Sequence, residues 1–311
     1  MECGMKRMVL ALGGNALSQD VEGTIESQRQ TIEKAVTHIE PLASAGHELV
    51  FTHGNGPQVG QLLVQNEEST STPPRPLDVL VAETQAQIGY LLQQALGNAL
   101  GVPPVTVITQ VRVDPTDSAF DRPTKRIGPF LDPDTIANRH FEVAEDSNTE
   151  GETGYRRVVP SPHPVEIIES EQIASLVDTG RPVICAGGGG VPVIEFEGGL
   201  EGIEAVIDKD HSSQVLANQI DADELLLLTD VQAAYRDFAT PERTRLDVLT
   251  TDEARTLLDA DEFGEGSMAP KVHAGITFVE QGGSRALITA IDTLTEALDG
   301  ETGTRIVQTD T

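Results

Sequence analysis

Short apolar runs alternate with longer amphipathic stretches along the first hundred residues of the chain. Residues 8–12 and 49–51 are continuous apolar runs of the length that buried strands have. Residues 27–45 and 78–100 instead repeat their apolar positions at the spacing of one helix face. A further strand is expected at 105–108. This alternation predicts a parallel sheet with helices on both faces, a three-layer α/β fold.

The same alternation returns after residue 160, where the pattern predicts a second α/β half. Its expected elements are a helix over 165–179, a strand over 182–186, a helix over 210–219, a strand over 224–228, a helix that opens with the capping box Thr250-x-x-Glu253, a helix over 270–281 and a final strand over 285–289.

Residues 112–160 interrupt this alternation between the two halves. They are rich in Asp, Pro, Arg, Thr and Gly and contain few long apolar runs. Structureless stretches of this length are uncommon in compact domains unless they are functional. We therefore interpret the stretch as a small subdomain that protrudes over the main sheet as a lid.

No apolar run approaches the roughly 18 residues that a membrane helix requires. The run Met8–Leu12 is too short for a signal peptide and ends in a glycine turn, so we expect a cytoplasmic protein without a membrane partner. Cys3 and Cys185 are the two cysteines, and they do not imply a disulfide framework.

The formal net charge of −29 changes the picture most. It argues against nucleic acid as a partner, because binding the phosphate backbone requires a basic surface. The acidic residues are spread along the chain, and lysine is scarce: the lysines are Lys6, Lys34, Lys125, Lys209 and Lys271. A dispersed acidic surface with few lysines fits a halophilic cytoplasm, where salt screens the repulsion. The alternative is an ordinary acidic protein.

Glycine-rich turns follow the ends of several expected strands. They are Gly13-Gly14-Asn15, His53-Gly54-Asn55-Gly56, the run Gly187–Gly190 and the looser Gly264-Glu-Gly-Ser267. Glycine lets backbone N–H groups approach an anion closely, and such turns lie where open α/β sheets bind ligands. They indicate a phosphorylated ligand. None of them matches a Walker loop, the dinucleotide fingerprint or the protein-kinase motifs.

Two lysine motifs offer the positive charge that phosphoryl transfer requires. Asp208-Lys209-Asp210 precedes an expected helix, and Lys271 begins another. The alternative for the tripeptide is an exposed ion pair without function. Seven histidines are scattered along the chain, without a His-Glu-x-x-His or paired-cysteine metal motif, and His53 is either a ligand contact or a turn residue.

Taken together, these motifs resemble those of carbamate kinases, a family within the amino-acid-kinase fold. The matching segments follow the family's order over nearly the whole chain: ALGGNAL (11–17), THGNGPQVG (52–60), IGY (88–90), RPTKRIGPF (122–130), RRVVPSPHPVEI (156–167), AGGGGVPV (186–193), GIEAVIDKD (202–210), LLTDVQAAY (227–235) and GSMAPKV (266–272).

The resemblance implies one α/β domain, 1–311, with a central, mainly parallel sheet of about eight strands. Its N-terminal lobe would comprise 1–111 with 161–200, its lid 112–160 and its C-terminal lobe 201–311. The resemblance also implies Mg²⁺ with ADP or ATP, a homodimer, and ATP formation from carbamoyl phosphate in arginine catabolism.

The resemblance assigns the site as well. The catalytic residues would be Lys209, Lys271, Asp210 and Lys125. Carbamoyl phosphate would be bound by Gly13, Gly14, Asn15, Gly54, Asn55 and Gly56. The nucleotide would be bound by Gly188, Gly189, Asp208, Asp230, Tyr235, Met268 and Pro270. The metal would lie on the nucleotide phosphates, with no side chain assigned to it.

Two alternatives stay open at this point. Another phosphotransferase of the same fold would have a lysine in the first glycine turn, where this chain has Asn15. A non-catalytic ligand-binding protein on the same fold would have no need to retain Lys125, Lys209, Asp210 and Lys271 in a chain so poor in lysine.

Overall fold

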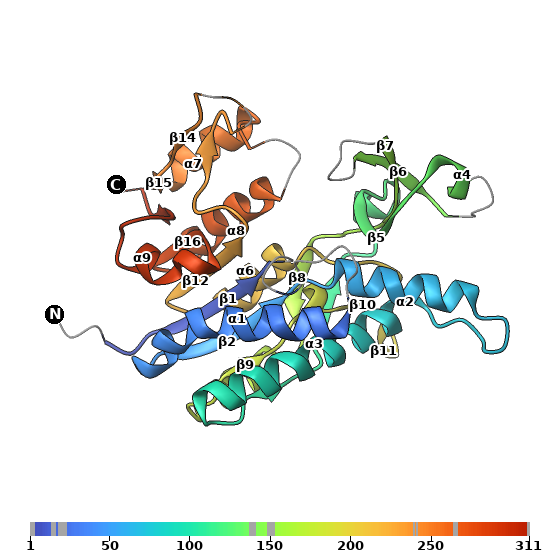
Figure 1. Ribbon diagram of the computed structural model, residues 1–311, viewed down its shortest axis with the longest axis horizontal. Coiled ribbons are helices and arrows are strands. Elements are labelled where there is room, and N and C mark those ends of the chain that lie inside the picture. Colours follow the sequence, from blue (N-terminus) through green and yellow to red (C-terminus); the bar gives the residue numbers. More distant parts are fainter. Residues whose placement is uncertain are drawn as a thin grey trace.

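The computed structural model describes residues 4–13, 17, 24–136, 141–147, 153–238, 240, 242–263 and 267–309 (Figure 1). Its centre is an eight-stranded sheet with the strand order β15-β17-β16-β12-β1-β2-β9-β3. All neighbouring strands are parallel except β16 and β17. The strands are β1 (Arg7–Leu12), β2 (Glu48–His53), β3 (Val105–Thr106), β9 (Val183–Ile184), β12 (Glu224–Thr229), β15 (Val248–Thr250), β16 (Arg285–Ala290) and β17 (Thr304–Val307).

Helices cover both faces of this sheet, which confirms the expected three-layer, mainly parallel fold. One layer contains α1 (Ile25–Ser44), α3 (Leu77–Leu100) and α9 (Leu294–Leu298). The opposite layer contains α5 (Ser170–Val177), α6 (Lys209–Gln219), α7 (Thr251–Asp259) and α8 (Met268–Glu280). No helix in the described part of the chain is both long and apolar enough to cross a bilayer.

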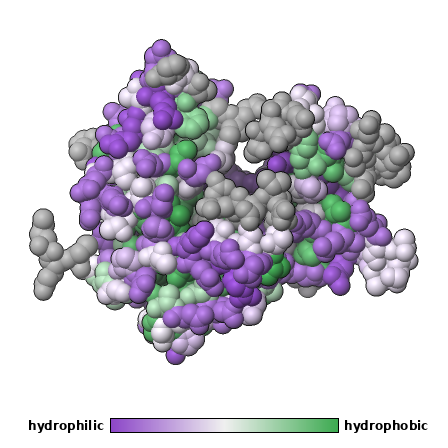
Figure 2. All heavy atoms as spheres, viewed as in Figure 1, coloured by the Kyte–Doolittle hydropathy of each residue, from purple (hydrophilic) through white to green (hydrophobic). Residues whose placement is uncertain are grey.

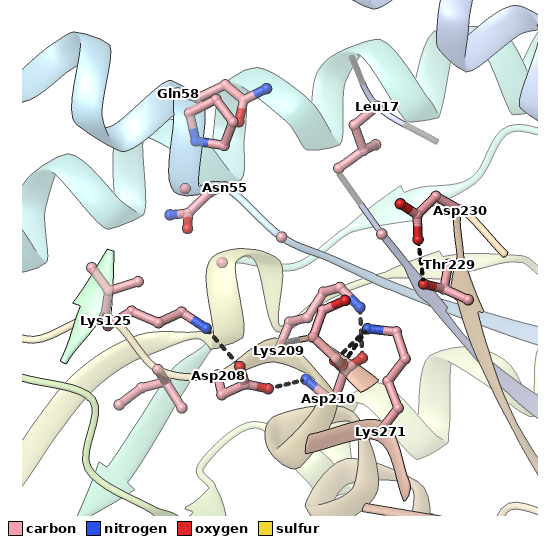
Figure 3. Close-up of a pocket in the computed structure, with 18 residues that line it drawn as sticks. Leu17, Asn55, Gln58, Lys125, Asp208, Lys209, Asp210, Thr229, Asp230 and Lys271 are labelled. Atoms are coloured by element: carbon pink, nitrogen blue, oxygen red, sulfur yellow. Dashed lines mark hydrogen bonds and ion pairs between the residues drawn. The ribbon is translucent and has the colours of Figure 1, made fainter. Parts of the chain in front are cut away.

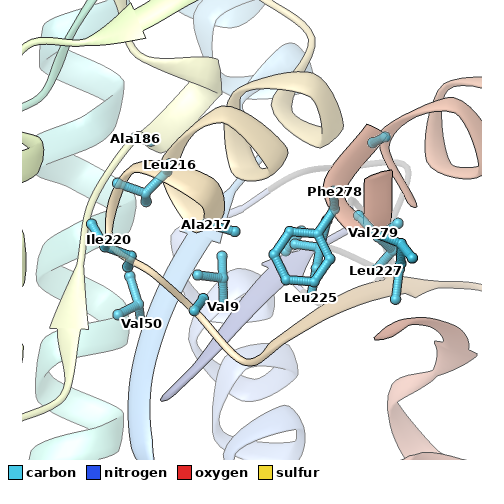
Figure 4. Packing of buried hydrophobic residues seen from close by; sticks show 14 of the residues in the cluster. Val9, Val50, Ala186, Leu216, Ala217, Ile220, Leu225, Leu227, Phe278 and Val279 are labelled. Carbon is cyan, nitrogen blue, oxygen red and sulfur yellow. The ribbon is translucent and has the colours of Figure 1, made fainter. Parts of the chain in front are cut away.

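Successive residues of β1 pack into opposite layers. Val9 and Ala11 belong to the cluster under α6 and α8, part of which Figure 4 shows, whereas Leu10 belongs to the cluster under α1 and α3. Leu10 lies beside Phe51 of β2 and Leu226 of β12. Because both faces of the central strands are buried, their sequences are continuously apolar instead of alternating.

Three smaller sheets surround the central one. A four-stranded sheet has the order β11-β10-β4-β8, and a two-stranded ribbon pairs β13 with β14. The three-stranded antiparallel sheet β5-β7-β6 projects from the body beside α2, at the upper right of Figure 1. These elements are α2 (Gly56–Glu68), β4 (Gln110–Val113), β5 (Lys125–Leu131), α4 (Pro133–Ile136), β6 (Val143–Ser147), β7 (Thr153–Val159), β8 (Pro164–Ile167), β10 (Val191–Phe196), β11 (Gly199–Gly202), β13 (Tyr235–Arg236) and β14 (Thr244–Arg245), with 3₁₀ turns η2 (Ser118–Phe120), η3 (Gly187–Gly189) and η4 (Ile291–Thr293).

The structure corrects several sequence predictions. The helix expected over 165–179 is wrong at its start, because residues up to Ile167 pair with β4 as strand β8 and the helix begins at Ser170. The strand expected at 105–108 pairs with β9 only over Val105–Thr106. The strand at 285–289 is not the last, since β17 follows and pairs antiparallel to it. Helix α2 was not predicted at all.

The projecting sheet touches the body through two glycines. Gly60 of α2 faces Gly128 of β5 so closely that a Cβ atom at position 60 would lie 1.9 Å from the Cα of Gly128. Gly128 itself has a φ of +76°, which glycine adopts without strain. No side chain fits at position 60, and position 128 requires a positive φ, so glycine at both positions allows β5 to pack on α2.

We therefore predict that Gly60→Ala destabilises the protein. The added methyl group forces β5 away from α2, and overpacking of this kind typically costs about 1–3 kcal/mol. The free energy of unfolding, measured by denaturant titration in concentrated KCl, should fall by that amount. Gln61→Ala, at the exposed neighbouring position of the same helix, is the matched control and should unfold like the wild type. Equal stability of the two variants would contradict the close contact.

Candidate functional site

A cavity of about 330 Å³ opens at the carboxyl ends of β1, β2 and β12, where they meet the start of α6 (Figure 3). Figure 2 shows that this face is hollowed between the part that carries α7 and α8 and the projecting sheet. Open α/β sheets bind their ligands at this edge, because loops and helix N-termini converge there. The walls are formed by Gly13, Leu17, Gly54, Asn55, Gly56, Pro57, Gln58, Lys125, Gly188, Val206, Ile207, Asp208, Lys209, Asp210, Thr229, Asp230, Ser267 and Lys271.

Asp210 joins two lysines from different helices at one wall of the cavity. Its Oδ1 accepts a hydrogen bond from Lys209 Nζ at 2.6 Å, and its Oδ2 accepts one from Lys271 Nζ at 3.0 Å. Asp210 and Lys271 are each only 3 % exposed. Lys271 also donates to the carbonyl oxygen of Ser267 at 3.2 Å. The result is a buried group of three charges with a net charge of +1 at the edge of the cavity.

Asp208 connects this group to the projecting sheet. It is the N-cap of α6, and its Oδ1 accepts a hydrogen bond from the Asp210 backbone N–H at 2.9 Å. Its Oδ2 accepts one from Lys125 Nζ of β5 at 2.6 Å. One carboxylate therefore caps the helix that begins with Lys209 and also holds a lysine from a different sheet.

The charges of this network shift one another's pKa values. Burial alone would raise the pKa of Asp208, but the charge and hydrogen bond of Lys125, together with the charge of Lys209, outweigh it and hold that pKa well below its usual range. Burial likewise opposes ionisation of Asp210, whose pKa is nevertheless lowered by Lys209 and Lys271. Burial lowers the pKa of Lys209, and Lys271 adds to this effect, although Asp210 opposes it. Both carboxylates are thus ionised at neutral pH.

A glycine turn closes the floor of the cavity. Gly188 lies against the side-chain amide of Asn55, so that a Cβ atom there would come within 2.2 Å of Asn55 Nδ2. The φ of Gly188 is +65°, which further restricts this position to glycine. Asn55 is buried and donates from Nδ2 to Thr84 Oγ1 at 2.9 Å. Gly188 therefore borders the cavity with backbone atoms alone.

Most of the residues predicted for the site come together here. Gly13, Gly54, Asn55, Gly56, Lys125, Gly188, Asp208, Lys209, Asp210, Asp230 and Lys271 all line the cavity. Gly14 and Asn15 lie outside the described residues. The sequence prediction did not assign Thr229 or Ser267 to the site, although each directly precedes a residue that it did assign.

The structure does not place four of the predicted residues in the cavity wall. The carbonyl oxygen of Gly189 accepts a hydrogen bond from Ser212 Oγ at 2.7 Å, behind the wall. Met268 packs against the hydrophobic cluster under α6 and α8. Tyr235 packs against Phe238 with ring centroids 5.9 Å apart. Pro270, in the first turn of α8, is the fourth.

His53 is a structural residue of this region and not part of the cavity wall. It is the last residue of β2, is 1 % exposed, and has its Nδ1 2.9 Å from the carbonyl oxygen of Gly54. Burial, and to a lesser extent the charge of Lys209, lowers the pKa of His53 to about 4. The ring is therefore neutral in the folded protein at neutral pH.

Comparisons with known proteins agree with this geometry. Residues 6–290 match the amino acid kinase family. A carbamate kinase of Halobacterium salinarum is 60 % identical over 98 % of this chain and 100 % of its own length. A solved structure of carbamate kinase from Giardia lamblia bound to citric acid has a TM-score of 0.91 at 40 % identity, and covers 99 % of this chain and 100 % of its own. The same Giardia lamblia enzyme bound to AMP-PNP has a TM-score of 0.89 at 39 % identity, with 99 % and 100 % covered.

The buried neutral His53 predicts a pH dependence of stability. In the unfolded chain this histidine takes up a proton near pH 6.5, whereas the folded protein resists protonation until about pH 4. Since the pKa in the folded state is the lower one, the stabilisation is fully present above pH 6.5 and is lost as the pH falls toward 4. The loss amounts to on the order of 3 kcal/mol.

Denaturant unfolding in concentrated KCl between pH 7 and 4 measures this loss. His53→Gln should reduce the slope of unfolding free energy against pH without abolishing it, because burial also lowers the pKa values of His211 and His273 and their contributions remain. Gln61→Ala, which removes no titratable group, is the control and should keep the wild-type slope. An unchanged slope in His53→Gln would show that His53 does not titrate as described.

Proposed function

We propose that this protein transfers the phosphoryl group of carbamoyl phosphate to ADP. The chain belongs to the amino acid kinase family and groups with its carbamate kinases. The observation that carries the proposal is the pair of ammonium groups that Asp210 holds at the cavity wall. An oxygen of the ADP β-phosphate forms a bond to phosphorus while the bond from phosphorus to the carbamoyl oxygen breaks, which releases carbamate. The reverse reaction uses ATP and carbamate.

This chemistry requires charge and positioning more than a strong base. Carbamoyl phosphate is an acyl phosphate, so its leaving group departs without a proton from the protein. The negative charge on the transferring phosphoryl group is stabilised by the ammonium groups of Lys209 and Lys271, which Asp210 holds in fixed places. Lys209 is the first residue of α6, so the helix N-terminus adds to the positive potential there.

The two substrates are assigned to opposite sides of the cavity. We place the carbamoyl group beside the glycine turns, against Gly13, Gly54, Asn55 and Gly56. Gly14 and Asn15, which follow Gly13 in the sequence, are assigned to the same substrate by the resemblance alone. We place the nucleotide phosphates beside Gly188, Asp208, Thr229, Asp230 and Ser267. Tyr235, Met268 and Pro270 follow these residues closely in sequence and are assigned to the more distant parts of the nucleotide, with Gly189 supporting the turn.

Mg²⁺ fits the nucleotide side of this cavity. The ion prefers oxygen ligands, and the carboxylate of Asp230 lies in the wall, where it accepts a hydrogen bond from Thr229 Oγ1 at 3.0 Å. Asp230 and the nucleotide phosphates would hold the ion. When bound, Mg²⁺ neutralises part of the phosphate charge.

The projecting sheet is proposed to act as a lid. Lys125 begins β5, and its side chain already reaches the cavity, where it contacts Asp208. An ammonium group at that point can also meet a phosphoryl group bound between the two sides. Residues 112–160 would then close over the substrates and exclude water, between an N-terminal lobe of 1–111 with 161–200 and a C-terminal lobe of 201–311.

We further propose a role in arginine catabolism, in which carbamoyl phosphate is used to make ATP, in the cytoplasm of a salt-accumulating cell. The acidic composition supports the salt-rich setting, as does the 60 % identity to the Halobacterium salinarum protein. The visible surface is largely hydrophilic (Figure 2). The assembly is proposed to be a homodimer.

The reaction is tested by ATP formation from ADP and carbamoyl phosphate with Mg²⁺ in molar KCl. Lys209→Ala should lower kcat by roughly 10²–10³, the effect of losing about 3–4 kcal/mol of transition-state stabilisation. Lys209→Arg should not restore it, because a planar fork does not replace a compact ammonium group.

Lys34→Ala, at an exposed position of α1, is the matched lysine control and should have the wild-type rate. Near-normal turnover of Lys209→Ala would contradict the assigned role. Folded wild-type protein that makes no ATP would contradict the reaction, and a panel of amino acids and nucleoside monophosphates with ATP would then identify the acceptor.

Removal of salt should unfold the protein. With a net charge of −29, repulsion between surface carboxylates is screened in molar KCl, where the Debye length is about 3 Å, and unscreened in dilute buffer. Circular dichroism should show loss of structure as KCl is lowered. Sedimentation in molar KCl should give twice the chain mass of 33.2 kDa. Full stability in dilute buffer would contradict the halophilic assignment. A monomer in molar KCl would contradict the proposed homodimer.

A further inference from the structure

We propose that His163, His211 and His273 form a binding site for a divalent transition-metal ion of the zinc class, beside the cavity described above. The three residues are far apart in sequence and come from three elements. His163 directly precedes β8, His211 lies in the first turn of α6, and His273 lies in α8. One potential ligand atom of each lies within 4.8 Å of the other two. None of the three lines the cavity.

The three imidazole rings pack on one another. The centroids of His163 and His211 are 4.7 Å apart in a stacked arrangement. His273 meets both rings edge-on, with its centroid 5.2 Å from that of His211 and 6.1 Å from that of His163. Burial lowers the pKa values of His211 and His273, and the neighbouring His163 adds to this effect, so these two rings favour the neutral form. Neutral imidazole is the form that binds metal ions.

His211 provides a second, independent observation. Its Nε2 atom is buried and has no hydrogen-bond partner among the described residues. A buried polar atom left without a partner costs free energy, and a metal ion bound at Nε2 would remove that cost. Burial lowers the pKa of His211 to about 4, which keeps the ring neutral at neutral pH.

His163 makes a hydrogen bond of the kind that metal-binding histidines make. Its Nδ1 atom lies 3.2 Å from the carbonyl oxygen of Pro164. Metal-binding histidines usually donate their second ring N–H to such an acceptor, and this fixes the tautomer. The hydrogen bond at Nδ1 therefore leaves the lone pair on Nε2 for the ion. The backbone N–H of His163 is held as well, by Asp117 Oδ2 at 2.9 Å.

The size and chemistry of the cluster select the kind of ion. Zinc binds imidazole nitrogen at about 2.0–2.1 Å with tetrahedral geometry, which places two ligand nitrogens about 3.4 Å apart. The potential ligand nitrogens of the three histidines are up to 4.8 Å apart, so the rings must move inward by about an ångström to bind the ion. His163 and His273 are exposed and have room for this rotation. Imidazole suits Zn²⁺, Cu²⁺, Ni²⁺ and Co²⁺, whereas Mg²⁺ prefers oxygen.

An ion at this position would act as a positioning device for the lysines. His211 is two residues after Lys209 on α6, and His273 is two residues after Lys271 on α8. A metal bound by all three histidines would connect the starts of these two helices to each other and to the segment that leads out of the projecting sheet. This inference concerns metal binding and does not depend on which phosphoryl acceptor the protein uses.

The experiment titrates chelator-treated, full-length protein with Zn²⁺ in molar KCl with excess Mg²⁺, and calorimetry measures the binding. A second titration uses Co²⁺ as the probe and measures visible absorption. The wild type should bind one Zn²⁺ per chain, and Zn²⁺ should raise its Tm. His163→Ala and His273→Ala should each weaken binding roughly tenfold or more and lose the Tm increase, by comparison with losses from disturbed ligand environments.

His38→Ala removes a histidine of α1 and should bind Zn²⁺ like the wild type. Because His163 and His273 are exposed, either variant suffices if the other does not fold, and the Tm of each without zinc reports on folding. The proposal would be overturned if the wild type bound no Zn²⁺, or if folded His163→Ala or His273→Ala protein bound it as tightly as the wild type.

Discussion

The ion group around Asp210 is the constraint on which the site depends. One carboxylate pairs with two ammonium groups that are largely removed from water. Burying charges is costly unless they are paired with good geometry, and loss of one partner leaves the others uncompensated. The helices that carry these residues must therefore keep a fixed separation. Packing of α6 on α8 over the central strands provides this, with Leu216 and Phe278 in the shared core.

Hydrogen bonds extend the same constraint into the sheet. Ser213 Oγ donates to the Lys209 carbonyl oxygen at 2.6 Å and lies 2.5 Å from Thr52 Oγ1 of β2. The first turn of α6 is thus fixed to the strand that leads into the glycine turn at Gly54. Because both sides of the cavity are tied to the start of one helix, a displacement of that helix would disturb both at once.

The sequence predicts those parts of the fold and the site that depend on local patterns of residues. Continuous apolar runs located the central strands, because burial on both faces leaves no place for polar residues, and scarce lysines pointed to Lys209 and Lys271. Prediction failed where long-range pairing decides. Nothing local distinguishes β8 from the start of a helix, since its strand form depends on β4. Likewise, His163, His211 and His273 carry no shared spacing and meet only because three separate elements converge.

The contact between Lys125 and Asp208 has a thermodynamic consequence for any anion that enters the cavity. The Lys125 ammonium group is already paired, with the Asp208 carboxylate at 2.6 Å. An incoming phosphate that recruits Lys125 exchanges one counter-ion for another, so it gains only the difference between the two interactions. The same exchange runs backward at departure, when Asp208 offers the lysine an immediate replacement. In such an enzyme the internal carboxylate competes with the phosphate for Lys125. Substrate binding in the ground state is weaker as a result, and release is faster.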